Sequence, residues 1–341
     1  MSVKHKVSRM AYSQYLLSTH ENYTLTHFAE HNPEYSHDQI NRYLNEDQLP
    51  PRLVWENVKG DVVQCGEGIL VFDDFVLVKA HSSEMGMVQK QWSGNVKAVV
   101  KGIGVVTCVY VNPKTGQFWV IDYRIYDPDT DHKSKLDHMR EMMHNAIAHK
   151  KLLFSICLMD SWYAALDEMV YTHNQGKTFY CPLKDNRYVV SAGETGDFCR
   201  VDTLVWSTQE LRTGKLVHLK GNSDFTVKLF RIDFPTGKRE FIVTNDLTQD
   251  WSPATQNVWG WRSKIEEFHR EVKQLTGIGQ CQCRLSRIIR NHIACAMLVW
   301  VRLKHLAFKT GRTVYQLKHG LLSDYLRREL ASPAIKMHFS A

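Results

Sequence analysis

Apolar residues along the chain recur with two different periods, and the change of period divides the sequence into regions. Residues 12–48 carry apolar side chains at helical spacing, with a break at Asn32-Pro33-Glu34. From residue 68 onward, Val, Ile and Phe gather in runs typical of strands. The first three runs cover residues 69–78, 98–111 and 117–126. The turn sequence at 112–116 joins the last two, so we expect an antiparallel meander.

Helical and strand patterns alternate after the meander. A helix is predicted over residues 133–150, and the continuous apolar run 152–159 is typical of a buried parallel strand. Further strands are expected at 177–183 and 239–244. This order of elements is that of a ribonuclease-H-like domain. We therefore expect an α/β fold: a mixed five-stranded sheet with flanking helices, a β-rich insertion, and helical N- and C-terminal regions.

One late helix carries two stripes of side chains. Over residues 259–273 and just beyond, an apolar stripe is predicted to be buried, formed by Ile265, Phe268, Val272 and Leu275. At 3.6 residues per turn, Arg262, Glu266 and Lys273 lie within about 40° of one another on a second stripe. A surface helix with ordinary charge pairs has the same pattern. The stripe therefore indicates a functional site only if residues elsewhere in the chain support that interpretation.

Acidic residues occur in the middle of one predicted strand and directly after another. Asp73 and Asp74 stand in the middle of the first strand, although acids are depleted in strand interiors. A buried carboxylate costs several kcal/mol unless it is paired or binds a metal. Asp160 follows the apolar run 152–159, at the carboxyl end of a strand, where open α/β sheets place active sites.

The spacing of Trp259, Arg262, Glu266 and Lys273 resembles the Y-(2)-R-(3)-E-(6)-K signature of bacterial insertion-sequence DDE transposases, with Trp in place of Tyr. Two further blocks support the resemblance, Val-Phe-Asp-Asp-Phe over residues 71–75 and Leu-Met-Asp-Ser-Trp-Tyr over residues 158–163. The resemblance covers roughly residues 68–310.

The resemblance implies a catalytic and metal-binding triad of Asp74, Asp160 and Glu266. Three oxygen donors suit Mg²⁺ or Mn²⁺, and the implied chemistry uses two such ions per active site. Family members commonly have Thr or Ser after the first catalytic Asp, whereas this chain has Phe75. The choice between Asp74, which the family motif aligns, and Asp73 therefore stays open.

The implied activity is cut-and-paste DNA transposition: cleavage at the element's ends, then transfer of the 3′-hydroxyl into target DNA. The implied partners are double-stranded DNA, as terminal inverted repeats and as target, and a second subunit in a synaptic homodimer. Five residues are expected to bind DNA: Trp259, Arg262, Lys273, Arg284 and Arg287. Trp206 and Trp251 are candidates to stack on a flipped base, although core positions are the better prediction for both. Two alternatives stay open, another ribonuclease-H-like nuclease and an inactive transposase-derived DNA-binding protein.

The patterns and the resemblance together predict five regions. They are a helical N-terminal region over 1–62, the first part of the catalytic core over 63–184, the β-rich insertion over 185–236, the second part of the core with the Glu266 helix over 237–280, and a basic helical region over 281–341. Within the first region, Ser36 and Gln39 predict a capping box. The helices it separates form either a DNA-binding helix-turn-helix or an αα-hairpin packed on the main domain. Residues 49–51, Leu-Pro-Pro, are expected to act as a linker.

Charge and composition limit the partners and the location that we expect for the protein. The formal net charge is +7, and residues 262–341 contain 15 Lys or Arg against five Asp or Glu. Such a basic C-terminal part suits a polyanion partner. The eight cysteines form no C-x-x-C pair, which argues against structural zinc and a disulfide framework. The longest apolar runs are too short to span a bilayer, so we expect no membrane partner and a cytoplasmic, nucleoid-associated protein of bacteria.

Overall fold

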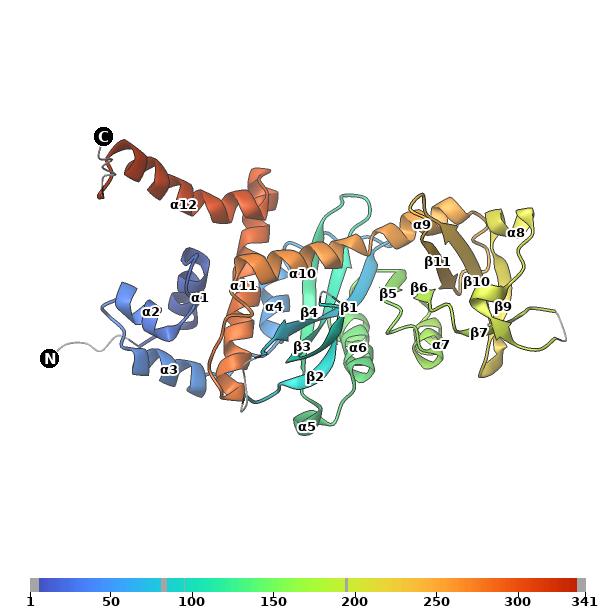
Figure 1. The fold of residues 1–341 in the computed structure, drawn as a ribbon, viewed down its shortest axis with the longest axis horizontal. Helices are drawn as coiled ribbons and strands as arrows, with labels where there is room; N and C mark the ends of the chain where they lie inside the picture. Colours follow the sequence, from blue (N-terminus) through green and yellow to red (C-terminus); the bar gives the residue numbers. More distant parts are fainter. Residues whose placement is uncertain (1–5, 81–84, 95, 194–195, 336–341) are drawn as a thin grey trace, which may run out of the picture. The chain divides into compact units, whose positions relative to one another are not determined.

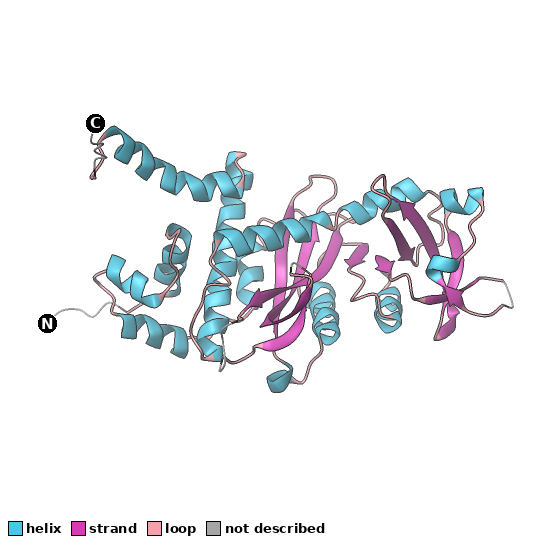
Figure 2. Cartoon of the chain, in the orientation of Figure 1, coloured by secondary structure: helices cyan, strands magenta, loops and turns pink. Residues whose placement is uncertain are grey.

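The computed structural model describes residues 6–80, 85–94, 96–193 and 196–335. The chain divides into two compact units. The first unit comprises residues 1–61, 76–103 and 268–341, and the second comprises residues 62–75 and 104–267. Three elements contribute to both units, strands β1 (Ile69–Val78) and β3 (Ala98–Val111) and helix α10 (Ser263–Leu275) (Figures 1 and 2).

The second unit contains a ribonuclease-H-like sheet. Its other strands are β4 (Phe118–Tyr126), β5 (Ile156–Met159) and β6 (Thr178–Leu183). The spatial order is β4-β3-β1-β5-β6, so the first strand lies at the centre. Strand β4 runs antiparallel to β3, whereas β5 runs parallel to β1 and to β6. The predicted mixed five-stranded α/β sheet is therefore confirmed.

Helices connect the strands of this sheet. A short helix α5 (Pro128–Asp131), α6 (Lys135–His144) and a π-helical turn (Asn145–His149) join β4 to β5, and α7 (Leu166–Asn174) joins β5 to β6. Ser134 and Asp137 form a capping box that starts α6. The predicted strand at 152–159 is shorter than expected: it begins at Ile156, and Leu153 before it is exposed.

Short strands and helices follow β6 and extend the same sheet. They are β7 (Tyr188–Ser191), β8 (Cys199–Arg200), a 3₁₀ turn (Val201–Thr203), α8 (Thr208–Thr213), β9 (Lys215–Leu219), β10 (Asn222–Asp233) and β11 (Arg239–Thr244). Strand β11 pairs antiparallel with both β6 and β10. The strand expected at residues 239–244 is thus confirmed, and it belongs to the same sheet.

Helices form most of the first unit around α11 (Ser286–Thr310). The other helices are α1 (Arg9–Ser18), α2 (Leu25–His31), α3 (His37–Glu46), α4 (Arg52–Val58) and α12 (Val314–Ala331). Helices α1, α3, α4 and α12 pack against α11, whose side chains are buried along most of its length. The short strand β2 (Gln89–Ser93) pairs with the first residues of β3.

Buried polar side chains fix these helices to one another. Asn291 of α11 donates to the carbonyls of Leu44 and Asp47, at the end of α3. Lys318 of α12 donates to the carbonyls of Leu16 and Thr19, at the end of α1. Because the last carbonyls of a helix have no partner within it, each contact satisfies groups that burial would otherwise leave unpaired.

Two predicted features of the helices are wrong. Residues 49–51 are no linker, because α4 begins directly after Pro51, a residue well suited to a helix start. Residues 259–273 do not form one helix: α9 (Ser252–Gly260) ends at Gly260, a turn follows at residues 261–262, and α10 begins at Ser263. Glycine is a poor helix former, which explains the break.

Other predicted features are confirmed. The apolar stripe of Ile265, Phe268, Val272 and Leu275 is buried as expected. Ser36 and Gln39 form the predicted capping box at the start of α3. Among the described residues, none of the helices combines the length and apolarity that crossing a lipid bilayer requires.

Candidate functional site

Strand β1 directs its two acids to opposite faces of the sheet, because successive strand residues alternate. Phe72 pairs with Met159 in the parallel register between β1 and β5. The next residue on each chain is an aspartate, Asp73 on β1 and Asp160 just after β5. Since paired residues share a face, the register places Asp73 beside Asp160 and directs Asp74 to the other face.

Arg262 joins three carboxylates on the Asp73 face. Its Nη2 lies 3.0 Å from Oδ2 of Asp73 and 3.4 Å from Oδ1 of Asp160. Its Nη1 donates to Oε1 of Glu266, in the first turn of α10. The Cζ atom lies 5.5 Å from the centre of the Trp259 ring. Three elements distant in sequence thus bring their acids to one guanidinium.

We call Asp73, Asp160, Arg262 and Glu266 the Arg262 cluster. The exposed fraction of the side chain differs among its members. The side chains of Asp73 and Arg262 are 14% and 20% exposed, whereas those of Asp160 and Glu266 are 35% and 54% exposed. The cluster is therefore closed at the strand and open toward solvent at the helix. A large polar ligand can reach it from the Glu266 side.

Burial dominates the electrostatics of Asp73. It raises the pKa of this carboxyl to about 7; Arg262 opposes that effect, and the charges of Asp160 and Asp74 add to it. Three acids face one cation, so the cluster carries excess negative charge when all are ionised. Such a group favours the approach of a further cation.

Asp74 belongs to a different set of contacts. Its Oδ2 lies 2.6 Å from Nζ of Lys135, at the start of α6, and its Oδ1 accepts a hydrogen bond of 3.1 Å from the Tyr163 hydroxyl. Lys135 also lies over the exposed ring of Trp162, 5.6 Å from its centre. Tyr163 is fully buried, and its backbone N–H donates to the carbonyl of Asp160. Asp74 thus ties α6 to the loop that follows Asp160.

The remaining predicted DNA-binding residues lie on the first unit. Lys273 is half-buried on the second half of α10. Arg284, just before α11, and Arg287, in its first turn, are exposed. In the second unit, Trp206 is half-buried and stacks on Phe241, their ring centres 6.5 Å apart. Trp251 is 57% exposed, so the expectation of a core position is wrong for this residue.

The donor chemistry of the Arg262 cluster fits a hard divalent cation, since every acid offers only oxygen. As placed, however, the acids surround the Arg262 guanidinium. Across residues 6–80, 85–94, 96–193 and 196–335, no group of three His, Cys, Asp or Glu side chains is close enough together to hold a metal ion. Arg262 here supplies the positive charge that the acids require.

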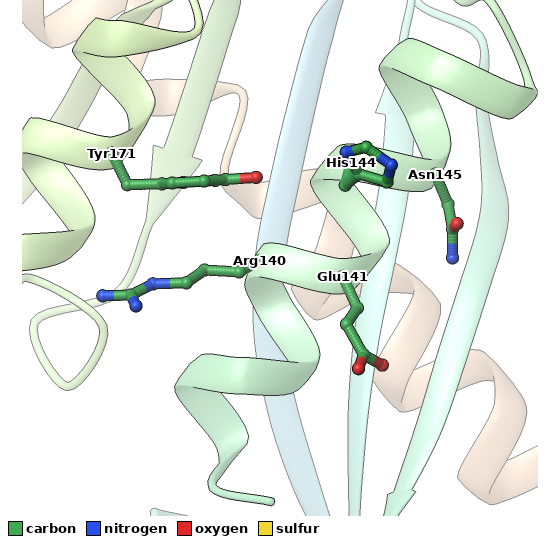
Figure 3. Close-up of a pocket in the computed structure, with 5 residues that line it drawn as sticks. All are labelled: Arg140, Glu141, His144, Asn145 and Tyr171. Carbon is green, nitrogen blue, oxygen red and sulfur yellow. The ribbon is translucent and has the colours of Figure 1, made fainter.

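A separate pocket of about 370 Å³ lies between α6 and α7 (Figure 3). Its lining residues are Arg140, Glu141, His144, Asn145 and Tyr171. Arg140 is already paired with the buried Glu168, at 2.7 Å, and lies over the Tyr171 ring. The cation of this pocket is therefore used within the fold.

Comparison with known proteins gives limited likenesses. No family model and no curated protein matches the chain. A structure of the piggyBac transposase synaptic complex with hairpin DNA is 10% identical, with a TM-score of 0.48 over 98% of this chain and 77% of that one.

Two endonuclease V structures are also similar. The Ciona intestinalis protein, in complex with DNA containing inosine, is 10% identical over 74% of this chain and 95% of its own, with a TM-score of 0.30. The Bacillus subtilis protein is 12% identical over 81% of this chain and 92% of its own, with a TM-score of 0.26. All three TM-scores lie below 0.5, so these likenesses carry no conclusion about function.

Sequence reasoning missed the two partners of Asp74. Lys135 opens an ordinary amphipathic helix, and no signal in the sequence marks it as the partner of Asp74. Tyr163 stands in the Asp-Ser-Trp-Tyr block that supported the resemblance, but its hydroxyl had no assigned role. The choice between Asp73 and Asp74 depends on the strand register that pairs Phe72 with Met159, which the sequence did not predict.

Proposed function

We propose that this chain is a DDE transposase that cuts DNA at the ends of a mobile element and joins the freed 3′-hydroxyl to target DNA. One observation carries the proposal: a ribonuclease-H-like sheet brings carboxylates from β1, from the end of β5 and from α10 to a single guanidinium. The spacing of Trp259, Arg262, Glu266 and Lys273 supports the assignment to the bacterial insertion-sequence group.

The proposed triad is Asp73, Asp160 and Glu266. Asp73 takes the place that the resemblance gave to Asp74, because Asp73 shares Arg262 with the other two acids, whereas Asp74 is paired with Lys135. These three side chains would hold Mg²⁺ or Mn²⁺. Bound ions of this kind supply Lewis-acid activation of the attacking oxygen and charge stabilisation of the leaving oxygen.

Residues of the chain itself would bind the DNA and orient it. Arg262 would be free to bind a phosphate flanking the scissile bond if its acids held divalent cations in place of its guanidinium. Trp259, beside Arg262, offers a ring face to a base or sugar. Lys273, Arg284 and Arg287 add cations that would bind the phosphates of the DNA backbone. Such contacts orient the protein on the DNA but do not read its sequence. Cutting two ends in concert calls for a homodimer.

The direct test is nicking of a labelled duplex that carries the inverted repeats flanking the gene, with Mg²⁺ or Mn²⁺. Wild type should cut at the repeat end. Glu266→Gln should lose activity by on the order of 100-fold or more, because it removes one carboxylate of the triad. The matched control is Glu267→Gln, which makes the same chemical change one residue away, in a side chain paired with Lys264. It should cut like wild type.

Three outcomes would redirect the proposal. Equal cutting by Glu266→Gln and wild type would remove Glu266 from the triad. Metal-dependent cleavage that ignores the repeats would favour another ribonuclease-H-like nuclease. Specific binding of the repeats without cleavage by any of the proteins would favour an inactive DNA-binding descendant.

A further inference from the structure

Strand β2 and the first residues of β3, which lie side by side in Figure 1, expose lysine and apolar side chains on one face. Their antiparallel register places Lys90 opposite Lys101 and Trp92 opposite Val99. Because strand residues two apart share a face, these two pairs lie next to each other. Trp92 is 62% exposed, Val99 is 64% exposed, and both lysines are exposed. We call these four residues the Lys90–Trp92 face.

The two lysines of this face oppose each other without a compensating acid. Like charges directly opposite in an antiparallel pair are destabilising. The sequence has three lysines and no acidic residue from position 85 to position 104. Within the parts of the chain that the structure describes, neither Lys90 nor Lys101 forms an ion pair. An anion bound between the two ammonium groups would relieve their repulsion.

Protection of the sheet edge does not explain this face. Lysines on an edge strand discourage pairing with other chains, and β2 is the last strand at one end of the sheet. Lys101, however, lies on β3, which has β2 on one side and β1 on the other. Trp92 and Val99 add exposed apolar surface to the edge, which such protection avoids. The face therefore fits a ligand that offers both negative charge and a flat apolar ring.

The chain just before β2 is held next to the start of α11. Gly86 donates its backbone N–H to the carbonyl of Arg284 at 3.2 Å. A side chain at Gly86 would collide with the Ser286 hydroxyl, so the close approach requires glycine. Arg284 and Arg287 are already proposed to contact DNA. The Lys90–Trp92 face is thus anchored, within the first unit, beside residues that share its proposed partner.

We propose that the Lys90–Trp92 face binds single-stranded DNA, with a phosphate between Lys90 and Lys101 and the adjacent base stacked on Trp92. Proteins that hold single strands combine cations for the backbone with aromatic rings for the bases. In a duplex, neighbouring bases cover each other's faces, so only the lysines would find a partner there. The identity of this ligand rests on the proposed function, because the ends of cut DNA fray into single strands.

Photocrosslinking locates the stacked base directly. The probe is a thymidine oligomer in which one base is replaced by 5-iodouracil, and the reaction contains no metal ion. Trypsin cuts after Lys90 and Lys97, and the peptide of residues 91–97 that it releases has one aromatic residue, Trp92. Mass spectrometry should find the crosslink in this peptide. A crosslinked protein whose 91–97 peptide is unmodified would overturn the proposal.

Fluorescence anisotropy then compares the thymidine oligomer with a duplex of the same length. Trp92→Ala should weaken binding of the single strand by about fivefold or more, because it removes the stacking surface, and should leave duplex binding unchanged. Trp92→Tyr keeps a ring and should retain most of the single-strand affinity. Tyr325→Ala, which removes a 52% exposed ring elsewhere in the first unit, is the control and should bind like wild type.

The lysine pair is tested by salt dependence. Replacing Lys90 and Lys101 together by Ala should reduce the slope of log K against log salt for the single strand by about 0.7, because one phosphate contact is lost. Lys59→Ala with Lys309→Ala, two exposed cations of the same unit, is the control. An unchanged slope in the Lys90 and Lys101 variant would overturn the proposed phosphate site.

Three further outcomes would overturn the proposal. One is wild-type binding of the single strand by Trp92→Ala, and another is an equal loss for the single strand and the duplex. Tighter binding of a uridine oligomer than of the thymidine oligomer would overturn the assignment to DNA. These assays use neither metal nor cleavage. Their failure would therefore leave the proposed transposase activity standing, and a failure to cut DNA would leave these measurements unaffected.

Discussion

At the scale of single residues, two adjacent aspartates have different surroundings. Asp73 faces Arg262 and Asp160, whereas Asp74 faces Lys135 and Tyr163. The sequence predicted that acids in mid-strand need partners. It could not say which one meets Asp160, because that depends on the pairing of β1 with a strand more than 80 residues later.

Replacing each aspartate by asparagine should therefore have opposite effects on stability and catalysis. Asp73→Asn should abolish cleavage while leaving the free energy of unfolding unchanged or higher, because it removes a carboxylate whose charge burial disfavours. Asp74→Asn should lower the free energy of unfolding by about 1–3 kcal/mol, because it leaves Lys135 without its anion. Urea unfolding and the nicking assay measure the two quantities on the same preparations. Loss of cleavage in a fully stable Asp74→Asn would restore Asp74 to the triad.

At the scale of elements, strands and apolar helix faces could be predicted from the sequence, whereas polar contacts between elements could not. The bounds of β1, β3 and β11 match the predicted runs, since β-branched residues mark strands clearly. Helix α11 lies within the region over 281–341 that the sequence predicted to be helical. No sequence pattern indicated that His292 is buried within it, where Nε2 donates to the carbonyl of Gly277 and Nδ1 accepts from the Tyr12 hydroxyl. That contact depends on how distant segments meet.

This buried histidine predicts acid sensitivity. Burial lowers the pKa of His292 to about 4 in the folded protein, against an unfolded value near 6.5. Between these values the unfolded chain binds more protons, so stability should fall as the pH falls from about 6.5 to about 4. The loss should total on the order of 3 kcal/mol. His292→Gln should lack this part of the pH dependence of urea unfolding, whereas the exposed control His319→Gln should retain it. Identical pH slopes for His292→Gln and wild type would contradict the assignment.

At the scale of the whole molecule, the five predicted regions do not coincide with the two compact units. Each predicted region was continuous in sequence. The first unit, in contrast, is assembled from three segments of the chain and the second unit from two. The difference arises because β1, β3 and α10 are long elements whose two halves pack in different surroundings. Periodicity identifies an element and its buried face, but it does not say where along that element the surroundings change.

Charge is also a property of the whole molecule. The excess of cations in residues 262–341 predicts DNA binding that weakens with salt. Replacing Arg284 and Arg287 together by Ala should reduce the slope of log K against log salt by about 2, because two phosphate contacts are lost. Fluorescence anisotropy with a random duplex measures the slope. Arg212→Ala with Lys220→Ala, two exposed cations of the second unit, is the control. An unchanged slope in the Arg284 and Arg287 variant would remove both residues from the DNA contact.

The span of chain between Asp73 and Arg262 sets a delay during synthesis. The two residues that meet at 3.0 Å are 189 positions apart. At roughly 5–20 residues per second, ribosomes need roughly 10–40 s to proceed from one to the other. Strand β1 must wait that long for the counter-ion of Asp73, and a chain released between residues 160 and 262 has Asp73 and Asp160 but neither Arg262 nor Glu266. Under the proposed function, such incomplete products lack one carboxylate of the triad and should be unable to cut DNA.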